Sequence, residues 1–361
     1  MSGHEILIAL MALFAVLGAA DRILGNRFGL GKEFEEGILA MGSLALAMAG
    51  VITLAPVLAA VLKPVVVPIY GFLGADPAMF AGTILACDMG GGSLAMELTD
   101  NTQAALLGGV ITGSMLGATV VFTIPIAMGI LKEEDRPAMA KGILCGIVTI
   151  PIGVLAGGLT AGFDTLLVLR NLIPIVLIAA LIVLGLWKAE GAMVRGFAAF
   201  GKGVVVLVTA GLAAAIVEGL TGFALIPGMA PISDAFETVG TIAIVLAGAF
   251  PLVAVLTRLL RKPLEKLGKL LGINDAAAAG LIASLANSIA TFGLVKDMNP
   301  RGKVVNIAFA VSAAFVFGDH LGYTAGFAPA LLPAMIAGKL AGGISAVALA
   351  LWLTRKEEKS L

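Results

Sequence analysis

Residues 76–98 have the sequence DPAMFAGTILACDMGGGSLAMEL, an apolar segment that Asp88 and a run of glycines interrupt at its centre. Asp76 and Pro77 form a typical helix beginning, because Asp is a good N-cap and Pro suits the first turn. The glycines allow the backbone to turn sharply and let a ligand approach main-chain groups. The segment therefore predicts a re-entrant hairpin, two half-helices that enter and leave a membrane on one side.

A second apolar segment, residues 275–298, has the same organisation. It follows a possible N-cap at Asn274 and is interrupted at Asn287 and Ser288. Backbone that is not helical at membrane depth is tolerated only inside protein or beside a water-filled cavity. We therefore expect both hairpin tips to lie in the protein interior.

The composition places the chain in a membrane. Of its 361 residues, 60% are hydrophobic and 13% are charged, whereas an ordinary globular protein has about 25% charged residues. The mean hydropathy is +1.07. A soluble fold of this size cannot bury so much apolar surface, because single cores stop growing and chains divide into domains.

The same composition excludes several partners and cofactors. Lys plus Arg number 23 and Asp plus Glu number 23, so no basic surplus points to nucleic acid. Two cysteines and two histidines are too few for a disulfide framework, a Cys-based metal cluster or a haem pair. No Walker motif is present, so nucleotide hydrolysis is not supported. We expect no cofactor and no bound metal.

Nine stretches besides the hairpins reach the length of about 20 apolar residues that a membrane span needs. They are residues 4–24, 37–61, 104–131, 138–160, 163–188, 203–223, 236–260, 302–322 and 324–353. We therefore predict an all-α polytopic membrane protein with about nine full transmembrane helices and two re-entrant hairpins.

The chain also repeats itself weakly at an offset of 199 residues. The matched pairs are Lys63 and Lys262, Asp76 and Asp275, Asp88 and Asn287, and Asp100 and Asn299. Five full spans separate equivalent points, and because five is odd the second unit must be inverted. We expect a first repeat (1–135), connecting transmembrane helices (136–200) and a second, inverted repeat (201–361). Inverted repeats with broken helices that meet near the midplane are a transporter architecture.

The basic residues predict the orientation. If loop 22–32 is cytoplasmic, 20 of the 23 basic residues lie on that side, as the positive-inside rule requires. Lys63 and Arg170 lie outside, Lys339 lies within the last span, and the N-terminus is outside and the C-terminus inside. The cytoplasmic set is Arg22, Arg27, Lys32, Lys132, Arg136, Lys141, Lys188, Arg195, Lys202, Arg258, Arg261, Lys262, Lys266, Lys269, Lys296, Arg301, Lys303, Arg355, Lys356 and Lys359.

Ionisable and polar groups at membrane depth are costly, so they are functional candidates. A carboxylate at the glycine-rich tip could bind a small cation, and an adjacent Asp and His could relay a proton or hold a hydroxyl group. The candidate substrate-binding residues are Asp88, Met89, Gly90, Gly91, Ser93 and Glu97 in the first hairpin, Asn287 and Ser288 in the second, and Asp319 and His320.

Each of these candidates also has a structural explanation. Asp88 and Asn287 could simply cap the half-helices that follow them. Asp319 and His320 could lie in an outer loop between the last two spans. Glu97 could lie in a solvated loop at the exit of the first hairpin.

Two segments resemble a known family. TILACDMGG at residues 83–91 and NIAFAVSAAFVFGDHL at residues 306–321 are similar to the bacterial ethanolamine utilisation transporter (EutH) family, and the resemblance extends over essentially the whole chain. It implies uptake of ethanolamine across the bacterial cytoplasmic membrane by a permease, not an enzyme. Asp88 and tip carbonyls would then bind the ammonium, and Asn287, Ser288 or His320 the hydroxyl group.

Other functions remain open at this stage. The same scaffold could carry another small polar metabolite, or the protein could be a channel. In a different class, Asp88 and Asp319 could be the paired carboxylates of an intramembrane aspartyl protease. A homodimer in the lipid bilayer is compatible with such a fold, and the sequence does not decide it.

Overall fold

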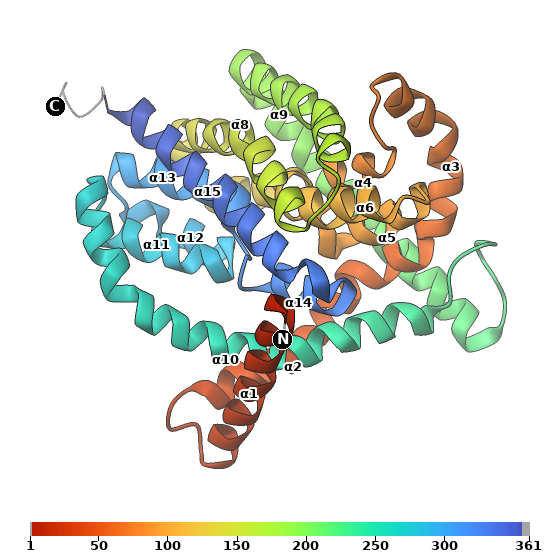
Figure 1. The fold of residues 1–361 in the computed structure, drawn as a ribbon, viewed down its shortest axis with the longest axis horizontal. Coiled ribbons are helices and arrows are strands. Elements are labelled where there is room, and N and C mark those ends of the chain that lie inside the picture. Colours follow the sequence, from red (N-terminus) through yellow and green to blue (C-terminus); the bar gives the residue numbers. More distant parts are fainter. Residues whose placement is uncertain (1, 356–361) are drawn as a thin grey trace.

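The computed structural model describes residues 2–355, apart from the side chains of Arg261, Leu264, Glu265 and Leu267. Lys356 and Lys359, two members of the predicted cytoplasmic set, lie outside the described residues. Within this part of the chain the regular elements are all helices (Figure 1). The predicted all-α class is therefore confirmed.

Seven helical stretches of the described chain are long and apolar enough to cross a membrane. They support a multi-pass membrane protein. Their bounds are Gly3–Ile23 (α1), Leu30–Phe72 (α2 and α3), Thr102–Ile130 (α6 to α7), Glu133–Thr160 (mostly α8, Arg136–Thr160), Thr165–Thr221 (α9), Ile232–Leu260 (within α10, Ile232–Leu271) and Pro329–Thr354 (mostly α15).

Several of these stretches are composite. α2 (Leu30–Leu44) continues through a π-helical turn into α3 (Gly50–Phe72). α6 (Thr102–Leu106) and α7 (Ile124–Ile130) are joined by the π-helical segments η3 (Leu107–Gly117) and η4 (Thr119–Thr123). π-Helical segments in α-helices are frequent at functional sites, and η3 is buried along its whole length.

Two predicted spans are fused, and two are divided differently from the prediction. α9 covers the predicted spans 163–188 and 203–223 with one non-helical residue, Ala189 (φ −148°, ψ 47°), between them. The predicted span 302–322 is not continuous, because α13 (Pro300–Ala313) ends and α14 (Asp319–Phe327) begins within it. The last span begins at α15 (Leu332–Thr354) instead of at residue 324. The seven stretches become nine spans only if α9 is counted as two spans and the broken α13–α14 pair as one more.

The two hairpin segments are interrupted where the sequence predicts. The first consists of α4 (Ala78–Ile84), a 3₁₀ turn (Cys87–Met89) and α5 (Gly91–Leu98). The second consists of α11 (Asp275–Ala286) and α12 (Ser288–Leu294), with Asn287 extended between them.

Both segments fold back on themselves. The Thr99 hydroxyl donates to the Asp76 carboxylate at 2.9 Å, so the end of the first segment lies beside its beginning. In the second segment the Asn274 side-chain amide donates to the Asp297 carbonyl at 2.8 Å. Entry into a membrane from one side, and the inverted relation between the two halves, stay predictions.

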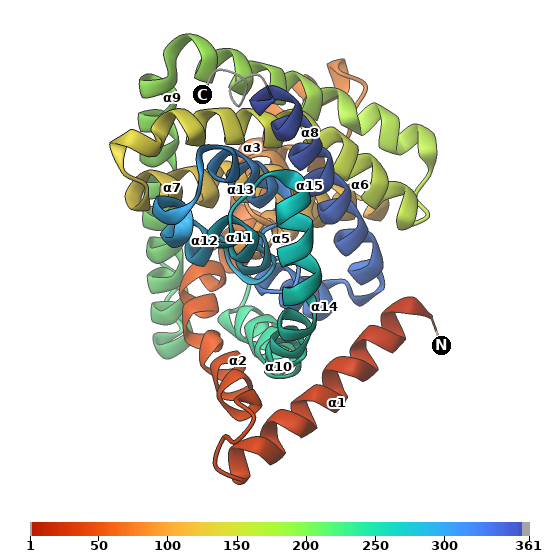
Figure 2. The same ribbon diagram turned by 90° about the vertical axis from the view of Figure 1, so that its left-hand side faces the viewer.

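Figures 1 and 2 give the arrangement of these elements. In Figure 1, α11 and α12 lie with α13 on one side of the molecule, and α4 and α5 lie on the other. α14 contacts the 3₁₀ turn of the first hairpin and also α10 and α15. α1 runs obliquely at the bottom of Figure 2 and packs against α2 and α10. The broken α13–α14 pair therefore connects the two hairpins.

Candidate functional site

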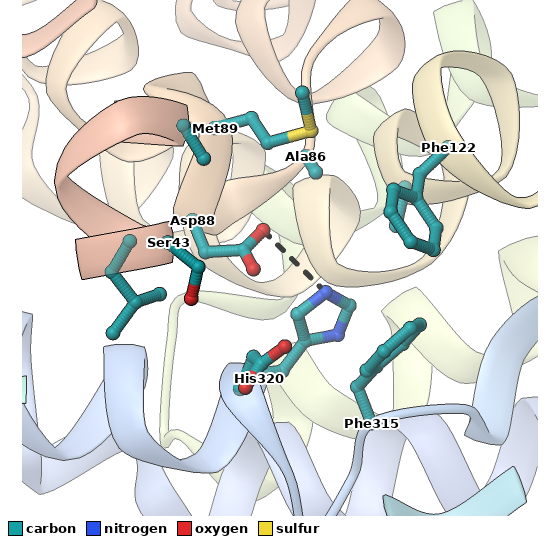
Figure 3. Close-up of a pocket in the computed structure, with 11 residues that line it drawn as sticks. Ser43, Ala86, Asp88, Met89, Phe122, Phe315 and His320 are labelled. Carbon is teal, nitrogen blue, oxygen red and sulfur yellow. Dashed lines mark ion pairs between the residues drawn. The ribbon is translucent and has the colours of Figure 1, made fainter. Parts of the chain in front are cut away.

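A cavity of about 210 Å³ lies between the tip of the first hairpin and the break between α13 and α14 (Figure 3). Its walls are mostly apolar, with two carboxylates, one imidazole and one serine among them. It is lined by Ser43, Leu44, Ala47, Ala86, Asp88, Met89, Ala118, Phe122, Phe315, Asp319 and His320.

The glycine run shapes the tip that carries Asp88. α4 ends where Leu85 becomes extended, and the chain then makes a tight turn in which Met89 and Gly91 both donate to the Ala86 carbonyl at 3.0 Å. Gly90 has φ +88°, a left-handed conformation that other residues resist. A β-carbon at this position would lie 1.9 Å from the Val51 side chain. The turn thus needs a glycine to place Asp88 in the cavity.

The opposite wall comes from the break in the predicted span 302–322. Phe315 has φ +63°, which is unusual for a bulky residue. Its N–H donates to the Ser284 carbonyl at 3.0 Å, and the N–H of Phe317 donates to the Leu285 carbonyl at 2.8 Å. α11 of the second hairpin therefore supplies the hydrogen bonds that a continuous helix would have made itself.

Asp88 and His320 meet across the cavity. The distance from Asp88 Oδ1 to His320 Nε2 is 3.6 Å, which is an ion pair if the imidazole is protonated and too long for a direct hydrogen bond. His320 is 3% exposed and Asp88 is 16% exposed, and both side chains line the cavity. Asp319 lines the same cavity and interacts electrostatically with Asp88. The cavity thus contains two carboxyl groups, which can bind a small cation when they are ionised.

Two phenylalanine rings form part of the cavity wall. The Phe315 ring lies 5.2 Å from the His320 ring and 5.5 Å from the Phe122 ring, centroid to centroid. Phe122 and Phe315 both line the cavity. Aromatic faces attract cations within about 6 Å of the ring centroid, so the rings can add to the pull of the carboxylates.

The cavity brings together four of the residues that the sequence singles out: Asp88, Met89, Asp319 and His320. Asp319 and His320 lie at the start of α14, not in an outer loop. Gly90 and Gly91 form the turn behind Asp88.

The remaining sequence candidates lie away from this cavity. Ser93 is half-buried and Glu97 is exposed on α5. The Asn287 side chain accepts from the Ile289 N–H at 2.7 Å, which is the helix-cap arrangement. The Ser288 hydroxyl is buried and has no hydrogen-bond partner among the described residues. Roles of these four residues in substrate binding stay predictions.

Sequence reasoning missed Lys339 as a site residue. Its side chain is 1% exposed, and its ammonium donates to the Ser114 carbonyl. Its charge interacts with Asp88 and Cys87. A lysine within an apolar span is itself a functional signal, so the sequence held the information. Phe122 had no comparable signal, because it is one of many apolar residues in its helix.

Three side chains could hold a metal ion. The ligand atoms of Cys87, Asp88 and His320 lie within 4.8 Å of one another, and thiolate, carboxylate and imidazole are all zinc ligands. The nearby Lys339 ammonium opposes a divalent cation at this place.

Comparison with known proteins identifies the family. The model of the family described as "Ethanolamine utilisation protein, EutH" matches residues 4–353. The chain belongs to this family. The resemblance seen in residues 83–91 and 306–321 is thereby confirmed.

Curated relatives cover nearly the whole chain. A "Probable ethanolamine permease EutH" of Listeria monocytogenes is 59% identical over 99% of this chain and 96% of the relative. An "Uncharacterized protein YxeR" of Bacillus subtilis is 51% identical over 98% and 96%. A "Probable ethanolamine permease EutH" of Salmonella typhimurium is 48% identical over 99% and 97%. No solved structure matches the chain.

The family assignment also decides between the classes of function. Two of the relatives carry the name "Probable ethanolamine permease EutH", which describes a transporter and not an enzyme. The chain is accordingly not an enzyme, and the aspartyl protease alternative for Asp88 and Asp319 is abandoned.

Proposed function

We propose that the protein is a permease that takes up ethanolamine, and that the Asp88 cavity binds the ethanolammonium cation. The observation that carries the proposal is a carboxylate held at a helix break in a small, mostly apolar cavity, in a chain of the EutH family. A cavity of about 210 Å³ is smaller than typical pockets for drug-sized ligands, which suits a solute with four non-hydrogen atoms.

The chemistry of the site matches the two ends of the substrate. The Asp88 carboxylate can accept charge-assisted hydrogen bonds from the ammonium, and these are about twice as strong as neutral ones. The hydroxyl group lies two carbons away, within reach of His320, whose imidazole can donate or accept. Phe122 and Phe315 would cover the cation with their rings.

The architecture supports transport by alternating access. Both hairpin segments are broken at their centres, and the α13–α14 break lies between them. Broken helices around a central site are a recurring feature of secondary transporters. We propose that the two hairpins are re-entrant, that the halves are inverted repeats, and that about nine spans cross the bacterial cytoplasmic membrane with the N-terminus outside.

Uptake of labelled ethanolamine into proteoliposomes tests the function. Wild-type protein is expected to give saturable uptake that a negative-inside potential stimulates, because the carried species is a cation. Competition by unlabelled small polar amines distinguishes ethanolamine from another metabolite on the same scaffold. Non-saturable flux would indicate a channel, and absence of ethanolamine uptake would refute the permease.

A matched pair of variants tests the binding residue. Asp88→Asn removes the charge and keeps the shape, and it is expected to weaken ethanolamine binding about 10- to 100-fold, as loss of a charged hydrogen bond does. Asp100→Asn makes the same change at an exposed position outside the cavity and is expected to leave uptake unchanged. Wild-type rate and affinity in Asp88→Asn would rule out this role of Asp88.

A further inference from the structure

We propose that Lys339 is a resident cation that balances the charge of Asp88 when the site is empty and competes with the substrate ammonium for it. The inference rests on the proposed function, because it concerns the same cavity. Lys339 would thereby set the affinity of the site for the substrate ammonium and allow the carrier to change conformation when no substrate is bound.

The position of Lys339 is costly for a lysine. It lies in α15, where its side chain is 1% exposed. The neighbouring Gly338 packs against Gly153 of α8 so closely that a β-carbon would lie 2.8 Å from the Gly153 carbonyl oxygen. α15 and α8 are therefore tightly packed beside Lys339. A buried ammonium needs compensating charge and hydrogen bonds, so a lysine here requires an anionic partner.

The one hydrogen bond that the described residues give to the Lys339 ammonium is insufficient compensation. It goes to the Ser114 carbonyl in the π-helical segment η3. An ammonium has three donors, and a single neutral carbonyl does not balance a full charge. The remaining compensation must come from the anionic groups that face the same interior.

Asp88 lies just beyond this carbonyl. Gly113, the residue before Ser114, packs on the tip of the first hairpin, and a β-carbon at Gly113 would lie 3.1 Å from the Cys87 nitrogen. Only one layer of backbone therefore separates the lysine from the turn that carries Asp88. Lys339 interacts electrostatically with Asp88 and with His320.

If Asp88, Asp319 and Lys339 are all charged, their charges balance one monovalent cation. With both carboxylates ionised, Asp88 and Asp319 contribute two negative charges and Lys339 one positive charge. The empty site then carries one net negative charge, and binding of ethanolammonium brings the total to zero. Without Lys339 the empty site would carry two uncompensated charges, and burial of unpaired charge is strongly unfavourable.

A purely structural role for Lys339 is the competing explanation. In that case Lys339 only links α15 to η3 through its hydrogen bond to Ser114. Its replacement would then lower the stability of the protein and reduce exchange and net uptake of the substrate equally. A resident cation has a different signature, because its removal strengthens attraction of the substrate ammonium and hinders the step in which the carrier returns empty.

Lys339→Met separates these roles, with Lys339→Arg as the control that keeps the charge. Two modes are measured in proteoliposomes: exchange of labelled against internal ethanolamine, and net uptake into empty vesicles. For Lys339→Met we expect a KM for exchange that is roughly tenfold lower, as for loss of one nearby unit charge. Net uptake is expected to fall at least about tenfold relative to exchange, whereas Lys339→Arg keeps the wild-type ratio.

Two results would overturn the inference. One is a Lys339→Met protein with an unchanged KM and an unchanged ratio of net uptake to exchange. The other is an equal fall of both modes at unchanged KM, which is the structural outcome. A wild-type protein without any ethanolamine transport would instead overturn the proposed function.

A double-mutant cycle based on melting temperatures tests the pairing of Asp88 and Lys339 even if a variant folds poorly or does not transport ethanolamine. Melting temperatures are compared for wild type, Asp88→Asn, Lys339→Met and the double variant. If the two charges balance each other, the double variant melts higher than Lys339→Met alone, because no unpaired carboxylate remains at Asp88. Additive shifts would show that the two charges are independent and would reject the pairing.

Discussion

Gly90→Ala tests whether the first tip is as tightly constrained as its geometry indicates. Gly90 has φ +88° and ψ 0°, and it begins α5 two residues after Asp88. A β-carbon there would lie 1.9 Å from Val51 Cγ1 and 2.5 Å from Val51 Cβ. Val51 is itself 1% exposed, so it has little room to move away.

Two separable costs follow from this geometry. The left-handed backbone costs an alanine about 1–2 kcal/mol, and overpacking a well-filled core costs about 1–3 kcal/mol. We therefore expect Gly90→Ala to lose about 2–5 kcal/mol of stability. Gly74→Ala is the matched control for strain alone, because Gly74 has φ +68° and its β-carbon would meet nothing within 4 Å.

The assay is the melting temperature of the purified protein together with ethanolamine uptake. Gly90→Ala is expected to melt below Gly74→Ala and to lose uptake, because relief of the clash moves the turn that holds Asp88. Adding Val51→Ala should remove the 1.9 Å contact with Cγ1 but leave the 2.5 Å contact with Cβ and the backbone strain, so the double variant should recover part of the loss. The reasoning is refuted if both glycine variants melt alike, or if Val51→Ala gives no recovery.

Three further predictions address other parts of the molecule. Lys303→Met should destabilise the protein by about 3–5 kcal/mol, because it leaves the carboxylate of Asp135, which is 2% exposed, without its ion-pair partner. Adding Asp135→Asn should restore part of the melting temperature, and a double variant without such recovery would contradict this. Phe122→Leu should raise the KM of uptake about two- to tenfold by removing a cation–π face, and an unchanged KM would exclude that contact. Ala283→Cys should react with an impermeant maleimide from the cytoplasm, because Ala283 lines a cavity of about 590 Å³ with Arg258; reaction only from outside would reverse the orientation.

The beginnings of the two hairpins and the turn at the first tip were predictable because their causes are local. The Asp76 side chain accepts from the Ala78 N–H at 2.9 Å, and the Asn274 side chain accepts from the Ala277 N–H at 3.2 Å. Both contacts are helix-start signals that a sequence contains in full. The left-handed turn at Gly90 likewise follows from the residue type.

The break between α13 and α14 was not predictable, because its causes are distant in sequence. Residues 314–317 are AFVF, which continue an apolar helix by composition. The Ser284 and Leu285 carbonyls that hold the break open come from another helix. Without them the segment is an ordinary span, so the prediction of a continuous helix at 302–322 was reasonable and wrong.

The candidate site was partly predictable for the same reason. Asp88 and His320 each stood out as ionisable groups in apolar segments, but their 3.6 Å approach depends on the tertiary fold. Lys339 is likewise an ionisable residue in an apolar segment, but the sequence does not show that it lies near Asp88. Phe122 and Phe315 gain significance only from the cavity that they line.

The two hairpins contribute to the site in different ways, and this difference has a mechanical consequence. The first presents its own side chain, Asp88, to the cavity. The second uses Asn287 to cap its own helix and holds Phe315 and Phe317 through backbone hydrogen bonds. Since the held segment leads directly into His320, we expect a movement of the second hairpin to shift the imidazole relative to Asp88. Binding of a solute that spans both groups would therefore couple the positions of the two hairpins, which alternating access requires.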